Sequence, residues 1–178
     1  MSDLMIDLET VSTKHNAVIL TAAAVKFDVY SDKVFDGLYL RPDIEEQTAQ
    51  GRDIDNGTLE WWSKQEDNVK NEAFGDEDRI SLPDFLNQIH KFCWNVDRIW
   101  AKGPLFDIII LENIFRANNM NMPWSYSKIR DARTVYDMDP ESISLIKDAH
   151  NAFMDCLNQI TVVQAVYKKL GVKNAFDK

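Results

Sequence analysis

Two acidic residues separated by a single residue, Asp7 and Glu9, lie in the segment Met-Ile-Asp-Leu-Glu-Thr at positions 5–10. The other residues of this segment favour a buried strand, and a strand turns successive side chains to opposite faces. The two carboxylates are therefore expected on the same face, where their like charges repel each other. A hard divalent cation such as Mg²⁺ or Mn²⁺ relieves this repulsion, because such ions prefer oxygen ligands. Acidic pairs are also common on exposed strand edges, so a metal site needs further ligands from elsewhere in the chain.

A third candidate ligand, Asp107, follows a Gly-Pro break at positions 103–104 and begins an apolar stretch that reads as a buried helix. An acidic residue in this position commonly stabilises the helix N-terminus through the helix dipole. A carboxylate at the start of a buried helix, just after the end of a strand, is also well placed to bind a metal ion. The residue alone leaves both roles open.

Asp155 is a fourth candidate ligand, and His150, five positions before it, is a possible base. Five residues of α-helix turn a side chain by about 140°, so both residues can face one site only if the helix begins between them. Asn151 is a good N-cap for such a helix. It leaves His150 in the preceding loop and turns Asp155 inward. The alternative is an exposed loop histidine and an acidic residue that only favours the helix N-terminus.

The elements that must position these residues include both strands and helices. Strands are predicted over residues 3–8, 17–30, 34–40, 98–101 and 127–131. Helices are predicted over residues 43–51, 81–93, 107–118 and 151–170, and Thr58 is expected to cap a further short helix that carries two tryptophans. Short turns join the first three strands, which indicates an antiparallel meander, and helices alternate with strands afterwards. This order favours an α/β fold with a mixed central sheet.

The composition fits one domain, which we expect to span residues 1–178. Hydrophobic residues make up 45% of the chain and charged residues 28%, as in globular proteins with a substantial core. No apolar run is long enough to span a bilayer, and no basic segment followed by an apolar one is visible at the N-terminus. Two cysteines far apart in sequence fit a reducing compartment better than a disulfide framework. We therefore expect a cytoplasmic protein without a membrane partner.

The net charge of −9 argues against a broad basic surface for duplex DNA. It does not exclude an enzyme that acts on nucleic acid, because each bound divalent cation supplies two positive charges where a phosphate must bind. The charge therefore excludes one class of nucleic-acid-binding protein and leaves metal-dependent enzymes open.

Taken in order, three motifs of this chain resemble those of the DEDD superfamily of exonucleases. They are Ile-Asp-Leu-Glu-Thr at positions 6–10, Gly-Pro-Leu-Phe-Asp at 103–107 and His-Asn-Ala-Phe-Met-Asp at 150–155. The histidine of the third motif is typical of the DEDDh subclass. The Trp-Trp pair at 61–62 and Arg-Asp-Ala-Arg-Thr at 130–134 are similar to one branch of that subclass. This branch groups phage DexA-type exonucleases, exodeoxyribonuclease-VIII-like proteins and small bacterial 3′–5′ exoribonucleases.

The resemblance implies a ribonuclease H-like three-layer fold, with a five-stranded mixed central sheet flanked by helices. It implies two divalent metal ions, Mg²⁺ or Mn²⁺, and the release of nucleoside 5′-monophosphates from the free 3′ end of mainly single-stranded DNA or RNA. A bacterial or phage-infected host cytoplasm and a monomeric or homodimeric state fit this activity. The alternative is a catalytically silent relative that binds nucleic-acid ends or a protein, although such a relative has no need of all five motif residues.

The same resemblance implies a role for each motif residue. Asp7 bridges both metal ions. Glu9 and Asp155 complete the site of the ion nearest the attacking water, and Asp107 supports the second ion. His150 takes a proton from the attacking water, because an imidazole can act as a general base at neutral pH.

Five further residues are candidates for contacts with the substrate: Thr10, Trp61, Trp62, Arg130 and Arg133. Thr10 is expected to meet the 3′ hydroxyl, as the equivalent motif residue does in relatives. Aromatic side chains can stack on terminal bases. Because Trp61 and Trp62 are adjacent on a helix and face about 100° apart, at most one of them is expected to line the site. The two arginines are expected to hold phosphate or, alternatively, to pair with Asp131.

Overall fold

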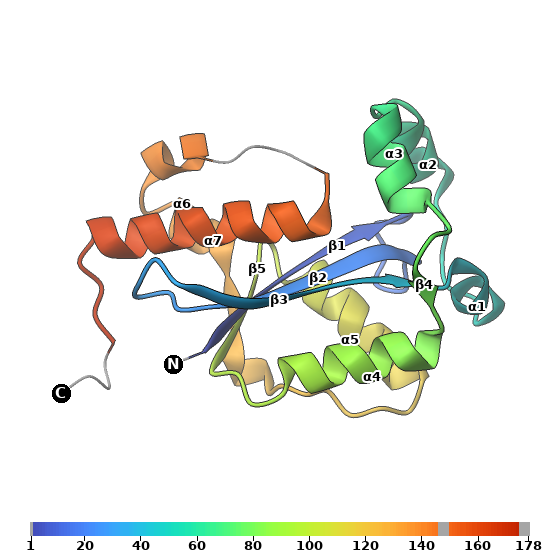
Figure 1. Cartoon of the computed structure of the whole chain (residues 1–178), viewed down its shortest axis with the longest axis horizontal. Coiled ribbons are helices and arrows are strands. Elements are labelled where there is room, and N and C mark those ends of the chain that lie inside the picture. Colours follow the sequence, from blue (N-terminus) through green and yellow to red (C-terminus); the bar gives the residue numbers. More distant parts are fainter. Residues whose placement is uncertain (1, 146–149, 175–178) are drawn as a thin grey trace.

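The computed structural model describes residues 2–145 and 150–174, which form a central sheet covered by helices on both faces (Figure 1). The six strands of these residues are β1 (Asp3–Thr10), β2 (Ile19–Phe27), β3 (Val34–Pro42), β4 (Arg79–Ile80), β5 (Arg98–Ala101) and β6 (Ile129–Asp131). Their order in the sheet is β4-β3-β2-β1-β5-β6. Strands β1, β2 and β3 form an antiparallel meander, whereas β5 runs parallel to β1 and β6 runs parallel to β5. The predicted mixed α/β sheet is confirmed, with six strands instead of five.

The helices lie in two layers with a small cluster at one end of the sheet. They are α1 (Ile44–Ala49), α2 (Asn56–Ser63), α3 (Asp67–Phe74), α4 (Leu82–Cys93), α5 (Asp107–Ala117), α6 (Ala132–Tyr136) and α7 (Ala152–Lys169). Helices α6 and α7 cover one face and α4 and α5 cover the other, while α2 and α3 lie beyond the end of β1 (Figure 1). Within the described ranges, no helix combines the length and apolar character needed to cross a membrane.

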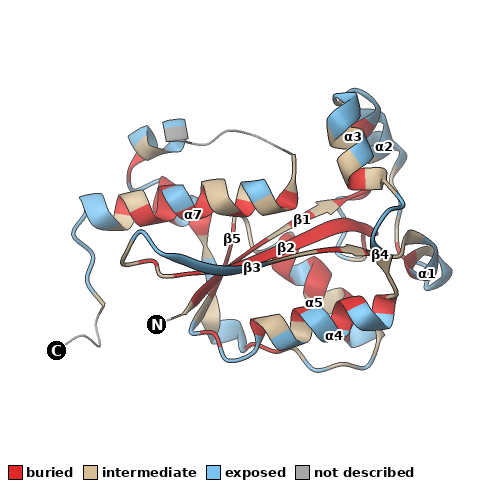
Figure 2. Cartoon of the chain, viewed as in Figure 1, coloured by how far each residue is buried: buried red, intermediate tan, exposed pale blue. Residues whose placement is uncertain are grey.

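Alternation along β1 divides its side chains between the two layers. Leu4, Ile6 and Leu8 are buried in the core that α4 and α5 share with the sheet. Met5 points the other way, into the core that α6 and α7 share with the sheet. Figure 2 shows buried residues along the central strands and in the helices that cover them. The remaining odd-numbered positions of β1 therefore point toward the layer of α7.

Helix α7 lies close to the sheet where β2 presents the small side chain of Ala23 to it. Ala23 pairs with Asp7 in the β1–β2 register and belongs to the same core as Cys156 of α7. The Cys156 sulfur lies 3.6 Å from the carbonyl oxygen of Met5 and 3.9 Å from that of Ala23. A larger side chain at position 23 would overpack this contact and push the helix away from β1.

Several predicted element boundaries are wrong: β2 begins at Ile19 instead of residue 17, and residues 127–128 belong to a 3₁₀ helix (Tyr126–Lys128) instead of a strand. A local side-chain hydrogen bond explains two further differences. Strand β2 ends at Phe27 instead of continuing to residue 30, because the Asp28 carboxylate accepts from the Tyr30 backbone N–H and closes a turn. Thr58 is not the N-cap of α2. Asp55 is the cap, and its carboxylate accepts from the Thr58 backbone N–H at 2.7 Å.

Helix α3 and strand β4 lie in a stretch for which the sequence predicts no regular element. Strand β4 has only two residues, Arg79 and Ile80, which pair in parallel with Arg41 and Pro42 of β3. Two residues cannot display the alternation by which strands are recognised. Helix α3 buries Ala73 and has no side-chain cap at its start. Its position depends on tertiary packing, which explains why local patterns do not reveal it.

Candidate active site

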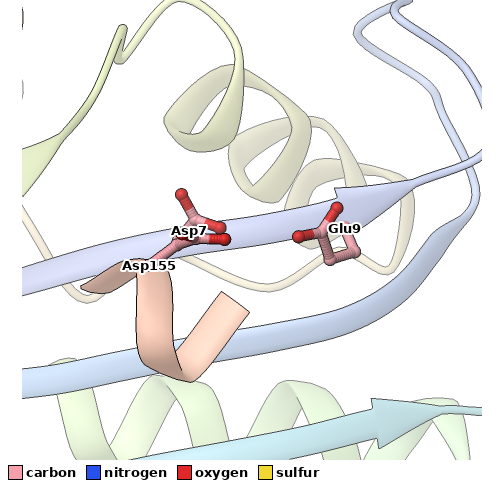
Figure 3. Close-up of side chains that lie close together, drawn as sticks. All are labelled: Asp7, Glu9 and Asp155. Atoms are coloured by element: carbon pink, nitrogen blue, oxygen red, sulfur yellow. The ribbon is translucent and has the colours of Figure 1, made fainter. Parts of the chain in front are cut away.

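Three carboxylates from two distant parts of the chain meet between β1 and α7 (Figure 3). Asp7 and Glu9 extend from β1 and Asp155 from the first turn of α7, and one oxygen of each lies within 4.8 Å of the others. The start of α7 is fixed by the predicted N-cap, since the Asn151 side chain accepts from the Met154 backbone N–H at 3.0 Å. In return, the Asp155 carboxylate accepts from the Asn151 backbone N–H at 3.1 Å. The cap thus orients the carboxylate that α7 contributes.

Asp107, the first residue of α5, lines the same pocket but lies outside this group of three oxygens. Its carboxylate accepts from the Leu8 backbone N–H at 3.0 Å. Pairing between β1 and β5 stops at Met5, so Asp107 supplies the partner that this buried N–H group needs. Burial, and after it the charge of Asp7, raises the pKa of Asp107 well above its usual range. The residue therefore ties α5 to β1 next to the acidic pair.

Burial and mutual repulsion favour the protonated forms of Asp7 and Glu9 near neutral pH. Burial raises the pKa of Asp7 to about 7, opposed by a hydrogen bond from Gln159, increased by the charge of Asp155 and lowered by that of Lys102. Burial raises the pKa of Glu9 to about 8, and the charges of Asp7 and Asp155 add to this shift. The three carboxyl groups of the cluster therefore resist carrying negative charge together.

This donor set fits a hard divalent cation. The clustered ligand atoms are all carboxylate oxygens, which Mg²⁺ and Mn²⁺ prefer, and a positive charge among them favours ionisation of the whole group. Gln159 adds a further polar atom. Its amide nitrogen donates to Asp7 at 2.7 Å, while its buried amide oxygen has no hydrogen-bond partner among the described residues. The polar groups of the site are thus incompletely satisfied by the described part of the protein alone.

The stability of the metal-free protein is expected to fall as the pH rises from about 5.5 to 8.5. The folded-state pKa values of about 7 for Asp7 and about 8 for Glu9 lie above their ordinary values of 3.8 and 4.5. Folding therefore takes up protons, and its favourable free energy is lost as these groups ionise. Each group contributes about 1.4 kcal/mol per pH unit up to its folded-state pKa, so the loss is roughly 5 kcal/mol and lowers the Tm of a chain of this size by roughly 10–20 °C. Thermal unfolding in EDTA at both pH values measures the fall.

Added Mg²⁺ or Mn²⁺ should raise the Tm more at pH 8.5 than at pH 5.5, because the ion competes with protons for the carboxylates. The variant Asp7→Asn serves as the comparison. It removes one of the titrating groups and should therefore make the Tm depend less on pH. Equal Tm values at both pH values, with and without divalent ions, would contradict a metal site at this position.

The two tryptophans of α2 have different surroundings. Trp62 is buried, and its indole N–H donates to the Thr10 carbonyl oxygen at 2.9 Å. Trp61 is 42% exposed, and its ring lies edge-on to the His150 ring at a centroid distance of 5.1 Å. Trp61 thus faces the carboxylate site, whereas Trp62 belongs to the core and supports the end of β1.

An open pocket of about 440 Å³ lies between α2 and the end of β1. Both tryptophans line it, together with Leu8, Glu9, Thr10 and Phe106, so the expectation that at most one of them would line the site does not hold for this pocket. The Thr10 hydroxyl donates to the Ser12 carbonyl oxygen at 2.7 Å, so it is already engaged within the chain. Because Glu9 and Phe106 line this pocket and the carboxylate pocket alike, the two spaces adjoin.

His150 lies in the loop before α7 and lines the carboxylate pocket. Its backbone has a φ of +45°, a left-handed conformation that asparagine and histidine adopt more readily than most residues. This conformation, followed by the Asn151 cap, turns the chain so that the imidazole and Asp155 reach the same space. The arrangement agrees with the predicted helix start between the two residues.

Only one of the two predicted phosphate-binding arginines lines the site. Arg133, on the first turn of α6, belongs to the carboxylate pocket. Arg130 does not line it, since its guanidinium donates to the carbonyl oxygens of Ser127 and Ile129 at 2.8 Å each. Asp131 is the N-cap of α6 and accepts from the Arg133 backbone N–H. Within the described ranges, the suggested pairing of Asp131 with an arginine side chain is therefore not observed.

Sequence patterns miss three polar residues of the pocket, Lys102, Asn158 and Gln159. Gln159 follows Asp155 by four positions on one helix, so helical spacing could have placed it on the same face. Lys102 directly follows β5, and only the parallel pairing of β5 with β1 brings it next to Asp7. That pairing joins segments far apart in the sequence, so no local sequence pattern predicts it.

Comparisons with known proteins identify the family of this chain. A family model described as the 3′–5′ exoribonuclease Rv2179c-like domain matches residues 2–167. The curated exodeoxyribonuclease of Enterobacteria phage T4 is 24% identical, and the match covers 98% of this chain and 93% of the phage protein.

Solved structures with the same fold include Exonuclease I from two organisms. The E. coli protein in complex with a dT13 oligonucleotide matches with a TM-score of 0.67 at 19% identity, over 96% of this chain and 42% of that chain. The protein from Methylocaldum szegediense matches with a TM-score of 0.70 at 14% identity, over 96% of this chain and 41% of that one. This chain thus spans about two fifths of the Exonuclease I chains, and the likeness shows a shared ribonuclease H-like fold.

Proposed function

This chain belongs to the 3′–5′ exoribonuclease Rv2179c-like family and is a DEDDh-type 3′–5′ exonuclease, and we propose that it uses two divalent metal ions to release nucleoside 5′-monophosphates from single-stranded ends. The observation that carries this proposal is the meeting of Asp7, Glu9 and Asp155 within 4.8 Å, next to His150 and an open pocket. Phosphodiester hydrolysis needs such a concentration of oxygen ligands beside a proton acceptor.

The residues that would hold the metals follow from their positions. Asp7, Glu9 and Asp155 would bind one ion, and Asp7 together with Asp107 would bind the second. When bound, the two ions activate the attacking water and neutralise charge on the phosphate and the leaving oxygen. Gln159 fixes the Asp7 carboxylate through its 2.7 Å hydrogen bond, which keeps the shared ligand in one orientation.

His150 is the proposed general base. It lines the carboxylate pocket and contacts the edge of Trp61, which restricts where the ring can lie. A proton accepted from the attacking water at an imidazole nitrogen can pass to solvent, because the histidine is only partly buried.

The pocket beside Trp61 is the proposed site of the terminal nucleoside. Its aromatic wall offers a surface on which a base can stack, worth about 1–3 kcal/mol. Trp62 supports this wall from the core by holding the Thr10 carbonyl group. The pocket lies beyond the end of β1 against α2, where it can hold the terminal nucleoside of a strand whose scissile phosphate lies at the carboxylates.

Side-by-side digestion of matched DNA and RNA oligomers with a 5′ label tests this function. We expect a ladder of products that shorten by one nucleotide from the 3′ end, that requires Mg²⁺ or Mn²⁺ and that disappears in EDTA. The family model and the phage relative are named for different sugars, so both substrates belong in the assay. Internal cleavage would contradict the proposal. Binding without turnover in saturating Mn²⁺ would instead support a catalytically silent relative.

A further inference from the structure

The carboxylate pocket has a positively charged end that the proposed chemistry does not use. Arg133 and Lys102 both line it, although the chain has a net charge of −9. The guanidinium of Arg133 donates no hydrogen bond and forms no ion pair with any residue in 2–145 or 150–174. The other six arginine side chains are all engaged by hydrogen bonds or ion pairs: Arg41, Arg52, Arg79, Arg98, Arg116 and Arg130. Within the described residues, Arg133 is therefore the one arginine whose guanidinium N–H groups are available to bind a ligand.

The position of the Arg133 side chain is defined by the backbone beneath it. Gly103 has a φ of +99°, and a Cβ atom there would lie 3.0 Å from Arg133 Nη1. The guanidinium thus packs over a site that only glycine leaves open. Asp131 accepts from the backbone N–H groups of Arg133 and Gly103, at 2.9 and 3.2 Å, and so joins the start of α6 to the end of β5. These contacts fix the arginine without neutralising it.

Lys102 is the second cation at this end. It follows β5, forms no ion pair within the described ranges, and its charge lowers the pKa of Asp7. One explanation is that Lys102 and Arg133 only balance the acidic cluster. Balance alone does not require an arginine whose side-chain donors are free of the described residues, since an ion pair with a carboxylate would serve better.

The order of the aromatic, acidic and basic groups along the site indicates the kind of ligand that it fits. Strands β1, β5 and β6 are parallel neighbours, so their C-terminal ends meet at one edge of the sheet. Across this edge lie the Trp61 pocket beyond β1, the carboxylates on β1, and then Lys102 after β5 and Arg133 after β6. An aromatic end, a metal-binding centre and a basic end match a terminal nucleoside, its phosphate and the next phosphate of a nucleic-acid strand.

We propose that Lys102 and Arg133 bind the phosphate immediately 5′ of the scissile phosphate. The substrate then lies with its 3′ nucleoside beside Trp61, and the rest of the strand leaves over β5 and β6. The assignment rests on the proposed function, because it takes the carboxylates as the site of the scissile phosphate. This assignment defines the direction in which the nucleic-acid strand crosses the site. Arg133, with its planar set of N–H donors, would be the main contact of that phosphate.

A strand with one neutral linkage tests the assignment. A methylphosphonate removes the charge of a single phosphate, and it is placed at the second or at the fourth linkage from the 3′ end of a 5′-fluorescent oligomer. Binding is measured by anisotropy in the Asp7→Asn background, which leaves the strand intact. We expect the second-linkage substitution to weaken binding at least about tenfold and the fourth-linkage substitution to weaken it less than about twofold.

The variant Arg133→Gln completes a double-mutant cycle. It should weaken binding of the all-phosphate strand by a similar factor and abolish the difference between that strand and the second-linkage strand. Lys102→Gln should reduce the difference. Arg116→Gln is the charge-matched control, because Arg116 lies far along α5 and pairs with Glu112 on the surface; it should change neither value.

Two outcomes would overturn the assignment. One is that the neutral second linkage weakens binding to the Arg133→Gln protein by the same factor as it weakens binding to the protein with Arg133. The other is a fourth linkage that matters as much as the second. A wild-type protein without turnover would contradict the proposed function, but the binding cycle does not require turnover, so the two failures can be told apart.

Discussion

Asp7→Asn is expected to abolish exonuclease activity, lowering kcat/KM by about 10³-fold or more, while the protein stays folded. Asp7 belongs to the carboxylate cluster and is the ligand that both metal ions are proposed to share, and an amide binds a hard divalent ion far less well than a carboxylate does. The amide that replaces the carboxylate keeps an acceptor oxygen for the hydrogen bond that Gln159 donates. Because burial raises the pKa of Asp7 to about 7, the substitution removes little charge from the metal-free protein below that pH and should stabilise it at higher pH.

Single-turnover hydrolysis and thermal unfolding together test this expectation. Asp36→Asn is the matched control, since Asp36 is exposed on β3 and its carboxylate accepts only from its neighbour Gly37 in the described part of the chain. It should alter neither rate nor Tm. Residual activity within tenfold of wild type in the folded Asp7→Asn protein would remove Asp7 from the metal-binding role.

The second large effect is expected from His150→Asn, which should lower kcat by about 10²–10⁴-fold with little change in KM. Asparagine is chosen because position 150 has a φ of +45°, and asparagine tolerates this conformation better than alanine does. The substitution therefore removes the proton acceptor while it preserves the turn that leads into α7. A loss of activity without a loss of Tm assigns His150 to the chemistry.

His15→Asn provides the comparison for this variant. His15 is exposed in the turn after β1 and does not line the carboxylate pocket. Measurement of kcat and KM with saturating Mn²⁺ separates an effect on the proton transfer from an effect on metal binding. If His150→Asn retains the wild-type kcat, another group must accept the proton.

The residues proposed to carry the chemistry were predictable where local geometry fixes them. The alternation of a strand places Asp7 and Glu9 on one side, and the structure shows the same arrangement. The Asn151 cap separates His150 from α7 and turns Asp155 inward, as the helical geometry requires. In both cases the deciding forces act over a few residues, so they are visible in the sequence.

The parts that escaped prediction depend on contacts between distant segments or on a choice between neighbouring groups. The start of α2 is predicted at the wrong residue because two neighbouring residues can act as N-cap. Asp55 is the cap, and its carboxylate accepts from the Thr58 backbone N–H. The role of Lys102 depends on the parallel pairing of β5 with β1. The different surroundings of the two arginines also depend on tertiary structure. The guanidinium of Arg130 binds nearby backbone carbonyl groups, whereas Gly103 leaves room for the guanidinium of Arg133.

The docking of α7 has a consequence for the time at which this enzyme becomes active. The hydrogen bond from Gln159 to Asp7 spans 152 positions of the sequence, and α7 also supplies much of the core on its side of the sheet. During synthesis, the described strands all leave the ribosome before this helix does. Until α7 has emerged and docked, a nascent chain therefore has the acidic pair of β1 without the third carboxylate of the cluster and without the proposed base. The proposed metal site is thus completed only when α7 packs against the sheet.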